Sequence, residues 1–254
     1  MKINHLIYLA FAGLVMAGCK DSDSTPQPIQ VAAADIPKRW EIVHSAIDSI
    51  REGDLVLRCG NDMTSYMLKD FSQTDKVFSH SGLAFKWNDS LYVFHNMAGD
   101  LNPDEVMRKD RIDSFLTPVS NMGFGIYRYD LDSQELAALK QKVFQHYENK
   151  LPFDMSFDLS TDDKMYCVEM IAKSVEEASR GRIQFTRSIV NADLKRKYLK
   201  MALQKKVLPS RESANQREYL AIDNLYMTPH CRPVTKTIFE TNNGPVRIPS
   251  GEKE

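Results

Sequence analysis

The sequence has little excess charge of either sign. It contains 33 Lys and Arg residues against 34 Asp and Glu residues, which gives a formal net charge of −1. A protein dedicated to nucleic-acid binding normally carries a strongly basic domain or patch. The near-neutral balance therefore argues against nucleic acid as the main partner.

The only long apolar run lies at the start of the chain. It extends from Ile7 to Ala17, follows Lys2, and is too short to cross a bilayer as a permanent helix. A basic residue followed by a short apolar core is typical of a signal peptide. We therefore expect residues 1–18 to be removed from the mature protein.

The end of this run resembles the lipobox of bacterial lipoproteins. Residues 14–18 read Leu-Val-Met-Ala-Gly and lead directly into Cys19. The resemblance implies cleavage before Cys19, lipidation of its thiol, and a domain tethered outside the cytoplasm to a bacterial membrane of the cell envelope. An ordinary signal peptide followed by a chance cysteine is the alternative.

Cysteine is scarce, with four residues in the whole chain. Once Cys19 is assigned to lipidation, Cys59, Cys167 and Cys231 remain, and no two of them have the close spacing of a zinc site. We therefore expect no metal and no organic cofactor. A bridge between Cys59 and Cys231 could persist in the envelope, and burial of two separate thiols is the alternative.

The rest of the chain is long enough for one domain. Residues 19–34 lack apolar periodicity and are expected to form a flexible tether, residues 35–241 to form the domain, and residues 242–254 to form a disordered tail. No internal repeat is present. The oligomeric state cannot be inferred from the sequence.

Apolar periodicity predicts an α+β domain with about five antiparallel strands and helices packed against them. Helical spacing is found over 35–50, 65–71, 132–147, 167–178 and 192–203. Strand patterns are found over 55–59, 81–87, 91–97, 123–129 and 220–226. The Lys- and Arg-rich segment 180–206 is expected to be a solvated face, with contact to an anionic polymer or lipid headgroups as the alternative.

The hairpin between residues 81 and 97 defines the positions of two histidines. A two-residue turn at Asn88 and Asp89 pairs Trp87 with Ser90, so that paired residue numbers add up to 177. This register predicts that His80 and His95 lie on one face as diagonal neighbours, with Cα atoms about 7 to 8 Å apart. A slip by one residue would place them on opposite faces.

Cys167 is expected at the first position of a helix. Unpaired amides and the helix dipole at such a terminus would lower the pKa of the thiol and could bind an oxyanion. A thiol, a base and a group that orients the base are what nucleophilic acyl transfer requires. We therefore predict Cys167 as nucleophile, His80 as base and His95 as the orienting group; an inert buried thiol and two structural histidines are the alternative.

Three blocks of the sequence resemble the signature blocks of the circularly permuted NlpC-type hydrolases, the YiiX-like group. They are Gly-Asp-Leu-Val at 53–56, Phe-Ser-His-Ser-Gly-Leu at 78–83 and Tyr-Cys-Val-Glu-Met at 166–170. The resemblance implies a papain-like fold in which the catalytic residues occur in the order His, third polar residue, Cys. Val168 and His95 depart from the family pattern, since a small polar residue and an acid are common at these positions. A histidine as third member is similar to the arrangement in lecithin retinol acyltransferase relatives.

The expected function is that of an envelope cysteine hydrolase. It would cleave an amide bond of a cell-wall peptide or related amino-acid conjugate through an acyl-enzyme on Cys167. The Val168 amide and the Tyr166 hydroxyl are candidates for binding the oxyanion. The alternatives are a lipid acyl hydrolase or acyltransferase, and a non-catalytic envelope-binding lipoprotein.

Overall fold

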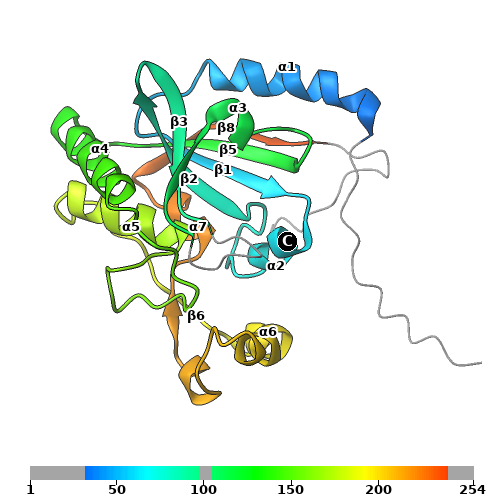
Figure 1. Ribbon diagram of the computed structural model, residues 1–254, viewed down its shortest axis with the longest axis vertical. Coiled ribbons are helices and arrows are strands. Elements are labelled where there is room, and N and C mark those ends of the chain that lie inside the picture. Colours follow the sequence, from blue (N-terminus) through cyan, green and yellow to red (C-terminus); the bar gives the residue numbers. More distant parts are fainter. Residues whose placement is uncertain (1–31, 98–104, 240–254) are drawn as a thin grey trace, which may run out of the picture.

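A six-stranded antiparallel sheet forms the centre of the computed structural model, which describes residues 32–97 and 105–239 (Figure 1). The strand order is β4-β3-β2-β1-β5-β8, and a separate two-stranded sheet pairs β6 with β7. The strands are β1 (Leu55–Gly60), β2 (His80–Trp87), β3 (Ser90–His95), β4 (Arg108–Arg111), β5 (Asn121–Tyr129), β6 (Ser188–Ile189), β7 (Glu218–Tyr219) and β8 (Cys231–Ile238).

Helices cover both faces of the large sheet (Figure 1). They are α1 (Ile36–Ile47), α2 (Met63–Lys69), α3 (Ile112–Phe115), α4 (Ser133–Glu148), α5 (Cys167–Ala178), α6 (Ala192–Gln204) and α7 (Ile222–Tyr226), with short 3-10 turns at Ala33–Asp35 and Glu212–Ala214. Helix α6 and the β6–β7 pair form a lobe at the opposite end of the molecule from α1 (Figure 1).

Alternation along the strands divides the core into two layers. On one face Leu55 belongs to a buried cluster with Leu139 of α4 and Val175 of α5. On the other face Val56, the next residue, belongs to a cluster with Val43 of α1. Helix α5, which starts at Cys167, therefore packs on the sheet beside the hairpin, as the sequence predicts.

The hairpin has the register predicted from its turn. Trp87 pairs with Ser90, and the pairing continues to Leu83 with Phe94. Asn88 and Asp89 have φ values of 48° and 63°. Both values lie in the left-handed region, as a type I′ turn requires, and this turn has the twist that joins neighbouring strands most directly.

One predicted strand is wrong, and two strands of the large sheet were not predicted. The strand expected over 220–226 is replaced by α7, because the Asn224 side chain accepts a hydrogen bond from the Ala221 amide (2.8 Å) and starts a helix. The last strand is β8 instead, an edge strand that contains Pro233 and is largely exposed. Strand β4 was not expected, because its four residues are all charged.

Several expectations lie outside the described residues. These are the signal peptide, lipidation at Cys19, most of the tether and the C-terminal tail. Within the described part of the chain, no helix is long and apolar enough to cross a membrane. Cys59 and Cys231 are both free thiols, so the bridge considered from the sequence is not formed.

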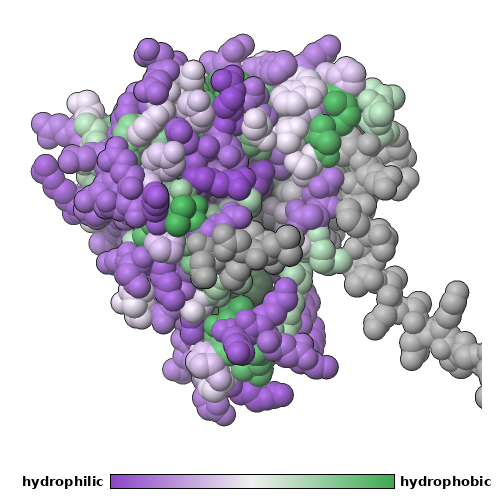
Figure 2. All heavy atoms as spheres, in the orientation of Figure 1, coloured by the Kyte–Doolittle hydropathy of each residue, from purple (hydrophilic) through white to green (hydrophobic). Residues whose placement is uncertain are grey.

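The surface shown in Figure 2 is mainly hydrophilic, with small apolar patches on the lobe that carries α6 and at the upper right near α1.

Some of the basic residues in segment 180–206 form ion pairs. Arg182 pairs with Glu135 (2.6 Å) and Arg187 pairs with Glu176 (2.9 Å). Lys200, Lys205 and Lys206 are exposed, in agreement with a solvated face.

The Gly53-Asp54 block anchors the start of β1. Asp54 is buried, and both of its carboxylate oxygens bind the Arg128 side chain of β5, at 2.6 and 2.7 Å. Oδ2 also accepts a hydrogen bond from the Arg51 amide (2.8 Å). Gly53 has a φ of 84°, which only glycine adopts without strain. The block therefore has a structural role.

We predict that Asp54→Asn lowers the free energy of unfolding by about 3 kcal/mol, because it leaves a poorly solvated guanidinium without its anion. Urea denaturation measures the change. Asp89→Asn is the matched control, since Asp89 is exposed in a turn that asparagine also favours, and its effect should stay within about 0.5 kcal/mol. Equal effects of the two substitutions would contradict the anchoring role.

Candidate active site

The two histidines of the hairpin are in direct contact. His80 begins β2 and His95 ends β3, and the Nε2 atom of His80 lies 2.9 Å from the Nδ1 atom of His95. His80 is 7% exposed and His95 is fully buried. The ring of Phe115 packs against both imidazoles, with centroids 5.7 Å from His80 and 5.1 Å from His95. The predicted register thus brings the rings within hydrogen-bond distance.

Asp110 extends this contact to a chain of three groups. Its Oδ2 atom lies 3.1 Å from the Nε2 atom of His95 and also accepts a hydrogen bond from Arg108 (3.1 Å). The hydrogen bond with His95 lowers the pKa of Asp110 to about 2. Asp110 is therefore a carboxylate at any working pH, and it can only accept hydrogen bonds.

This carboxylate determines which nitrogen atoms of the two rings carry protons. Burial lowers the pKa of both histidines, so both rings are neutral at pH 7. His95 must donate from Nε2 to Asp110, and its Nδ1 is then an acceptor. His80 therefore donates from Nε2 to His95. Its own Nδ1 carries a lone pair and is the only nitrogen of the pair that can act as a base.

Cys167 lies at the first position of α5 and is 9% exposed. Burial raises the pKa of the thiol. The polar groups of Ser81, Val168 and Cys167 itself that lie near the sulfur act in the opposite direction but are weaker. The expectation that the helix terminus lowers the pKa of this thiol is thus wrong in its net direction, because burial has the larger effect. The thiol is neutral at rest and needs a base.

The sulfur lies beside β2, the strand that carries His80. The backbone groups of Ala84 form hydrogen bonds with residues 53–54, just before β1. Backbone groups of successive residues point to opposite sides of a strand, so those of Ser81, three residues before Ala84, point toward β3. Pairing with β3 ends at Leu83, and the Ser81 amide is left for the sulfur. Among the hydrogen bonds of the described residues, none joins Cys167 to His80 directly.

Two charged residues of the site were not found from the sequence. Arg58 of β1 pairs with His80 across the sheet, and its charge contributes to the low pKa of that histidine. Asp110 completes the histidine chain. Neither belongs to a recognisable motif, because Arg58 interrupts an apolar strand and Asp110 lies in an all-charged segment. Only the pairing of β1 with β2 and of β3 with β4 places them here.

The Tyr166 hydroxyl forms its hydrogen bonds with the backbone of Leu220. It accepts a hydrogen bond from the Leu220 amide (2.7 Å) and donates to the Leu220 carbonyl (3.3 Å). The hydroxyl is thereby committed to a structural contact, which corrects the expectation that it could bind the oxyanion. The amides of Cys167 and Val168 remain as candidates for that role.

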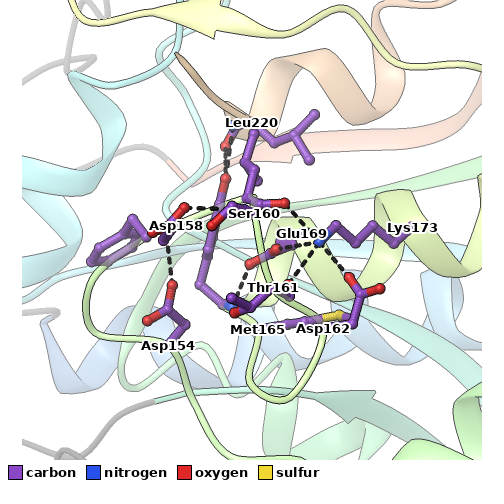
Figure 3. A network of polar contacts seen from close by, with 12 residues as sticks. Asp154, Asp158, Ser160, Thr161, Asp162, Met165, Glu169, Lys173 and Leu220 are labelled. Atoms are coloured by element: carbon purple, nitrogen blue, oxygen red, sulfur yellow. Dashed lines mark hydrogen bonds and ion pairs between the residues drawn. The ribbon is translucent and has the colours of Figure 1, made fainter. Parts of the chain in front are cut away.

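A buried ion pair holds the loop before Cys167 in place (Figure 3). Glu169 is fully buried, and its Oε1 atom lies 2.9 Å from the Nζ atom of Lys173. The same ammonium group binds the carbonyls of Leu159 (3.0 Å) and Thr161 (2.9 Å). The other oxygen of Glu169 accepts a hydrogen bond from the Tyr166 amide (3.4 Å), so the carboxylate caps α5 from within.

Glu169 should make stability depend on pH. Burial raises its pKa to about 7, against the opposing effect of Lys173. Between pH 4.5 and 7 the folded protein therefore keeps a proton that the unfolded chain has released. The unfolding free energy of the wild type, relative to Glu169→Gln, should fall as the pH rises through this window and level off above it. Urea denaturation of both proteins tests this, and a constant difference would show that Glu169 titrates normally.

No group of three or more His, Cys, Asp and Glu residues within 32–97 and 105–239 is arranged to hold a metal ion. His44, His146 and His230 lie away from the histidine chain. His230 pairs with Asp130 (3.1 Å) at the surface, and His44 stacks on Trp40. These residues provide no second candidate centre.

Comparison with known proteins agrees with this architecture. Residues 49–217 match the family described as permuted papain-like amidase enzymes, the YaeF/YiiX or C92 family. A search of curated proteins gives no significant match. Among solved structures, the crystal structure of the metalloprotein YiiX from Escherichia coli O157:H7 superposes with a TM-score of 0.58 at 17% identity, covering 74% of this chain and 98% of that one.

The structural likeness at this identity supports the fold, and the description as a metalloprotein applies to the E. coli protein. The family match covers most of the chain and includes the three blocks around residues 53–56, 78–83 and 166–170. The fold and family expected from the sequence are confirmed. The chain therefore belongs to the permuted papain-like amidases, a family of cysteine hydrolases.

Proposed function

We propose that this protein is an envelope amidase that cleaves a cell-wall peptide or a related amino-acid conjugate, with Cys167 as nucleophile and His80 as base. The observation that carries the proposal is the hydrogen-bonded chain of Asp110, His95 and His80. This chain leaves one lone pair, on Nδ1 of His80, next to the part of β2 that contacts the sulfur.

In the first half of the reaction, Nδ1 of His80 takes the proton of the Cys167 thiol. The sulfur then attacks the amide carbonyl carbon, and the amides of Cys167 and Val168 stabilise the negative oxygen. The imidazolium returns its proton to the departing nitrogen as the C–N bond breaks. An amine leaves, and a thioester remains on the enzyme.

In the second half, Nδ1 of His80 takes a proton from water, and the resulting hydroxide attacks the thioester. The C–S bond breaks, the acid is released, and the proton returns to the sulfur. His80 carries a positive charge in both halves. Asp110 supports that charge through His95, because each group in the chain donates toward the carboxylate.

The envelope location is supported by the lipobox-like sequence before Cys19, which would tether the domain to a membrane. Enzymes with this anchoring meet wall peptides and their fragments as amide substrates. The lipid-directed alternative has one observation in its favour, which is the histidine at position 95 in place of an acid. A cleft of about 460 Å³ in the described region is lined by polar residues such as Lys142, Asp162 and Arg187, but Cys167 is not among its lining residues, so the substrate panel below decides between the two.

We predict that Cys167→Ser abolishes hydrolysis of the amide substrate and formation of a thioester adduct, because a buried serine hydroxyl is a much weaker nucleophile. A panel of muropeptides, amino-acid conjugates and acyl lipids, followed by intact-mass spectrometry, identifies the substrate and the adduct. Cys231→Ser is the control and should retain activity, since Cys231 lies at the far edge of the sheet.

Turnover of acyl lipids but not of peptides would favour the lipid-directed enzyme. If Cys167 of the wild type reacts with iodoacetamide no faster than a free thiol at neutral pH, and no substrate of the panel is cleaved, the protein is a non-catalytic binding lipoprotein and the proposal is wrong.

A further inference from the structure

Arg58 is a half-buried cation that forms no ion pair with a carboxylate of residues 32–97 or 105–239. Its guanidinium lies over the ring of Phe115, with Cζ 4.7 Å from the centroid, and one terminal nitrogen lies 3.5 Å from the Met97 sulfur. No ion pair joins Arg58 to any carboxylate in the part of the chain that the structure describes. A thioether and an aromatic face are weak substitutes for the water that the charge has lost.

This cation lies next to the reacting groups. Arg58 pairs with His80 across β1 and β2, and the ring of Phe115 beneath the guanidinium also touches both histidines. Cys167 is near enough for its charge to act on Arg58. The guanidinium therefore lies within reach of a molecule bound at the sulfur.

Two described acids that act on Arg58 are already engaged in other contacts. Asp110 binds His95 and Arg108, both through Oδ2. Asp62 caps α2 by accepting hydrogen bonds from the amide and hydroxyl of Ser65, at 2.9 and 2.7 Å. Both carboxylates act on Arg58 only from a distance, and burial lowers the pKa of its guanidinium. An anion bound at this position would relieve the cost of burying the charge.

We propose that Arg58 binds a carboxylate of the substrate, so that the enzyme selects amides that carry a free carboxylate close to the scissile bond. The planar guanidinium can hold a carboxylate with two parallel hydrogen bonds, which fixes orientation as well as charge. Conjugates of amino acids and peptides with a free terminal carboxylate have this chemistry. The inference rests on the proposed function, because it assumes that Cys167 is the nucleophile.

A different role would use the same charge. Arg58 could act on the sulfur alone, by stabilising the thiolate that forms when His80 removes the proton. That role would change the reactivity of Cys167 toward every electrophile equally. Carboxylate binding would change it only for electrophiles that carry a carboxylate, so the two roles separate in one experiment.

The experiment compares iodoacetate with iodoacetamide, two reagents of nearly equal size of which only the first is an anion. Alkylation rates at Cys167 are measured by peptide mass spectrometry on the wild type, Arg58→Met and Arg58→Lys. Arg111→Met is the matched control, because Arg111 is an exposed arginine on β4 that pairs with Asp113 (3.4 Å). A short cysteine peptide gives the rate ratio of a free thiol.

We expect the iodoacetate-to-iodoacetamide ratio of the wild type to exceed that of the peptide by about tenfold, as one charge-assisted hydrogen-bonded contact would give. Arg58→Met should return the ratio to the peptide value, and Arg111→Met should leave it unchanged. A wild-type ratio equal to that of the peptide, or an unchanged ratio in Arg58→Met with both rates reduced, would overturn the proposal.

Should Arg58→Met fail to fold, as judged by circular dichroism, Arg58→Lys decides. Lysine keeps the charge but not the planar pair of donors, so carboxylate binding predicts a clear fall of the ratio, whereas an effect on the thiolate alone predicts no change. Failure of the proposed function would look different, since no amide substrate would then be cleaved and no thioester would form on Cys167, whatever the alkylation ratio.

Discussion

The site depends on the hydrogen bond between His80 and His95, 2.9 Å long and buried between the sheet and Phe115. Together with the hydrogen bond from His95 to the Asp110 carboxylate, it determines which nitrogen of each neutral ring carries the proton. Without it, His80 would have no preferred tautomer, and a thiol whose pKa is raised by burial would have no base. In the proposed reaction, the hydrogen-bonded groups Asp110, His95 and His80 provide the base that removes the proton of Cys167, since the terminus of α5 does not lower the pKa of the resting thiol enough to remove it.

Burial and charge around this bond act together. Burial keeps both imidazoles neutral, and Arg58 adds to that effect on His80. The capped terminus of α5, held by Glu169 and Lys173, positions the sulfur and the Val168 amide from the other side. The described residues therefore place a neutral imidazole and a neutral thiol beside the Arg58 cation, and the proposed selection of substrates with a carboxylate rests on this arrangement.

The parts of this site that the sequence predicts are those fixed locally. The two-residue turn at Asn88 and Asp89 sets the hairpin register and hence the contact of His80 with His95. Apolar spacing after Cys167 identifies α5. The roles of Asp110 and Arg58 could not be predicted, because no local sequence pattern determines where their side chains lie. No tight turn joins β1 to β2, and β4 has no apolar alternation, so both residues reach the site only through strand pairing over long sequence distances. The depth of burial that raises the thiol pKa is equally invisible in the sequence.

The positions of the protons on His80 and His95 test this account most directly. Nitrogen-15 spectra of the imidazoles at pH 7 distinguish the two tautomers from each other and from the imidazolium. We expect both rings to be neutral with the proton on Nε2, which leaves Nδ1 of His80 bare. A proton on Nδ1 of His80, or a charged His80 ring at that pH, would contradict the assignment of this residue as the base.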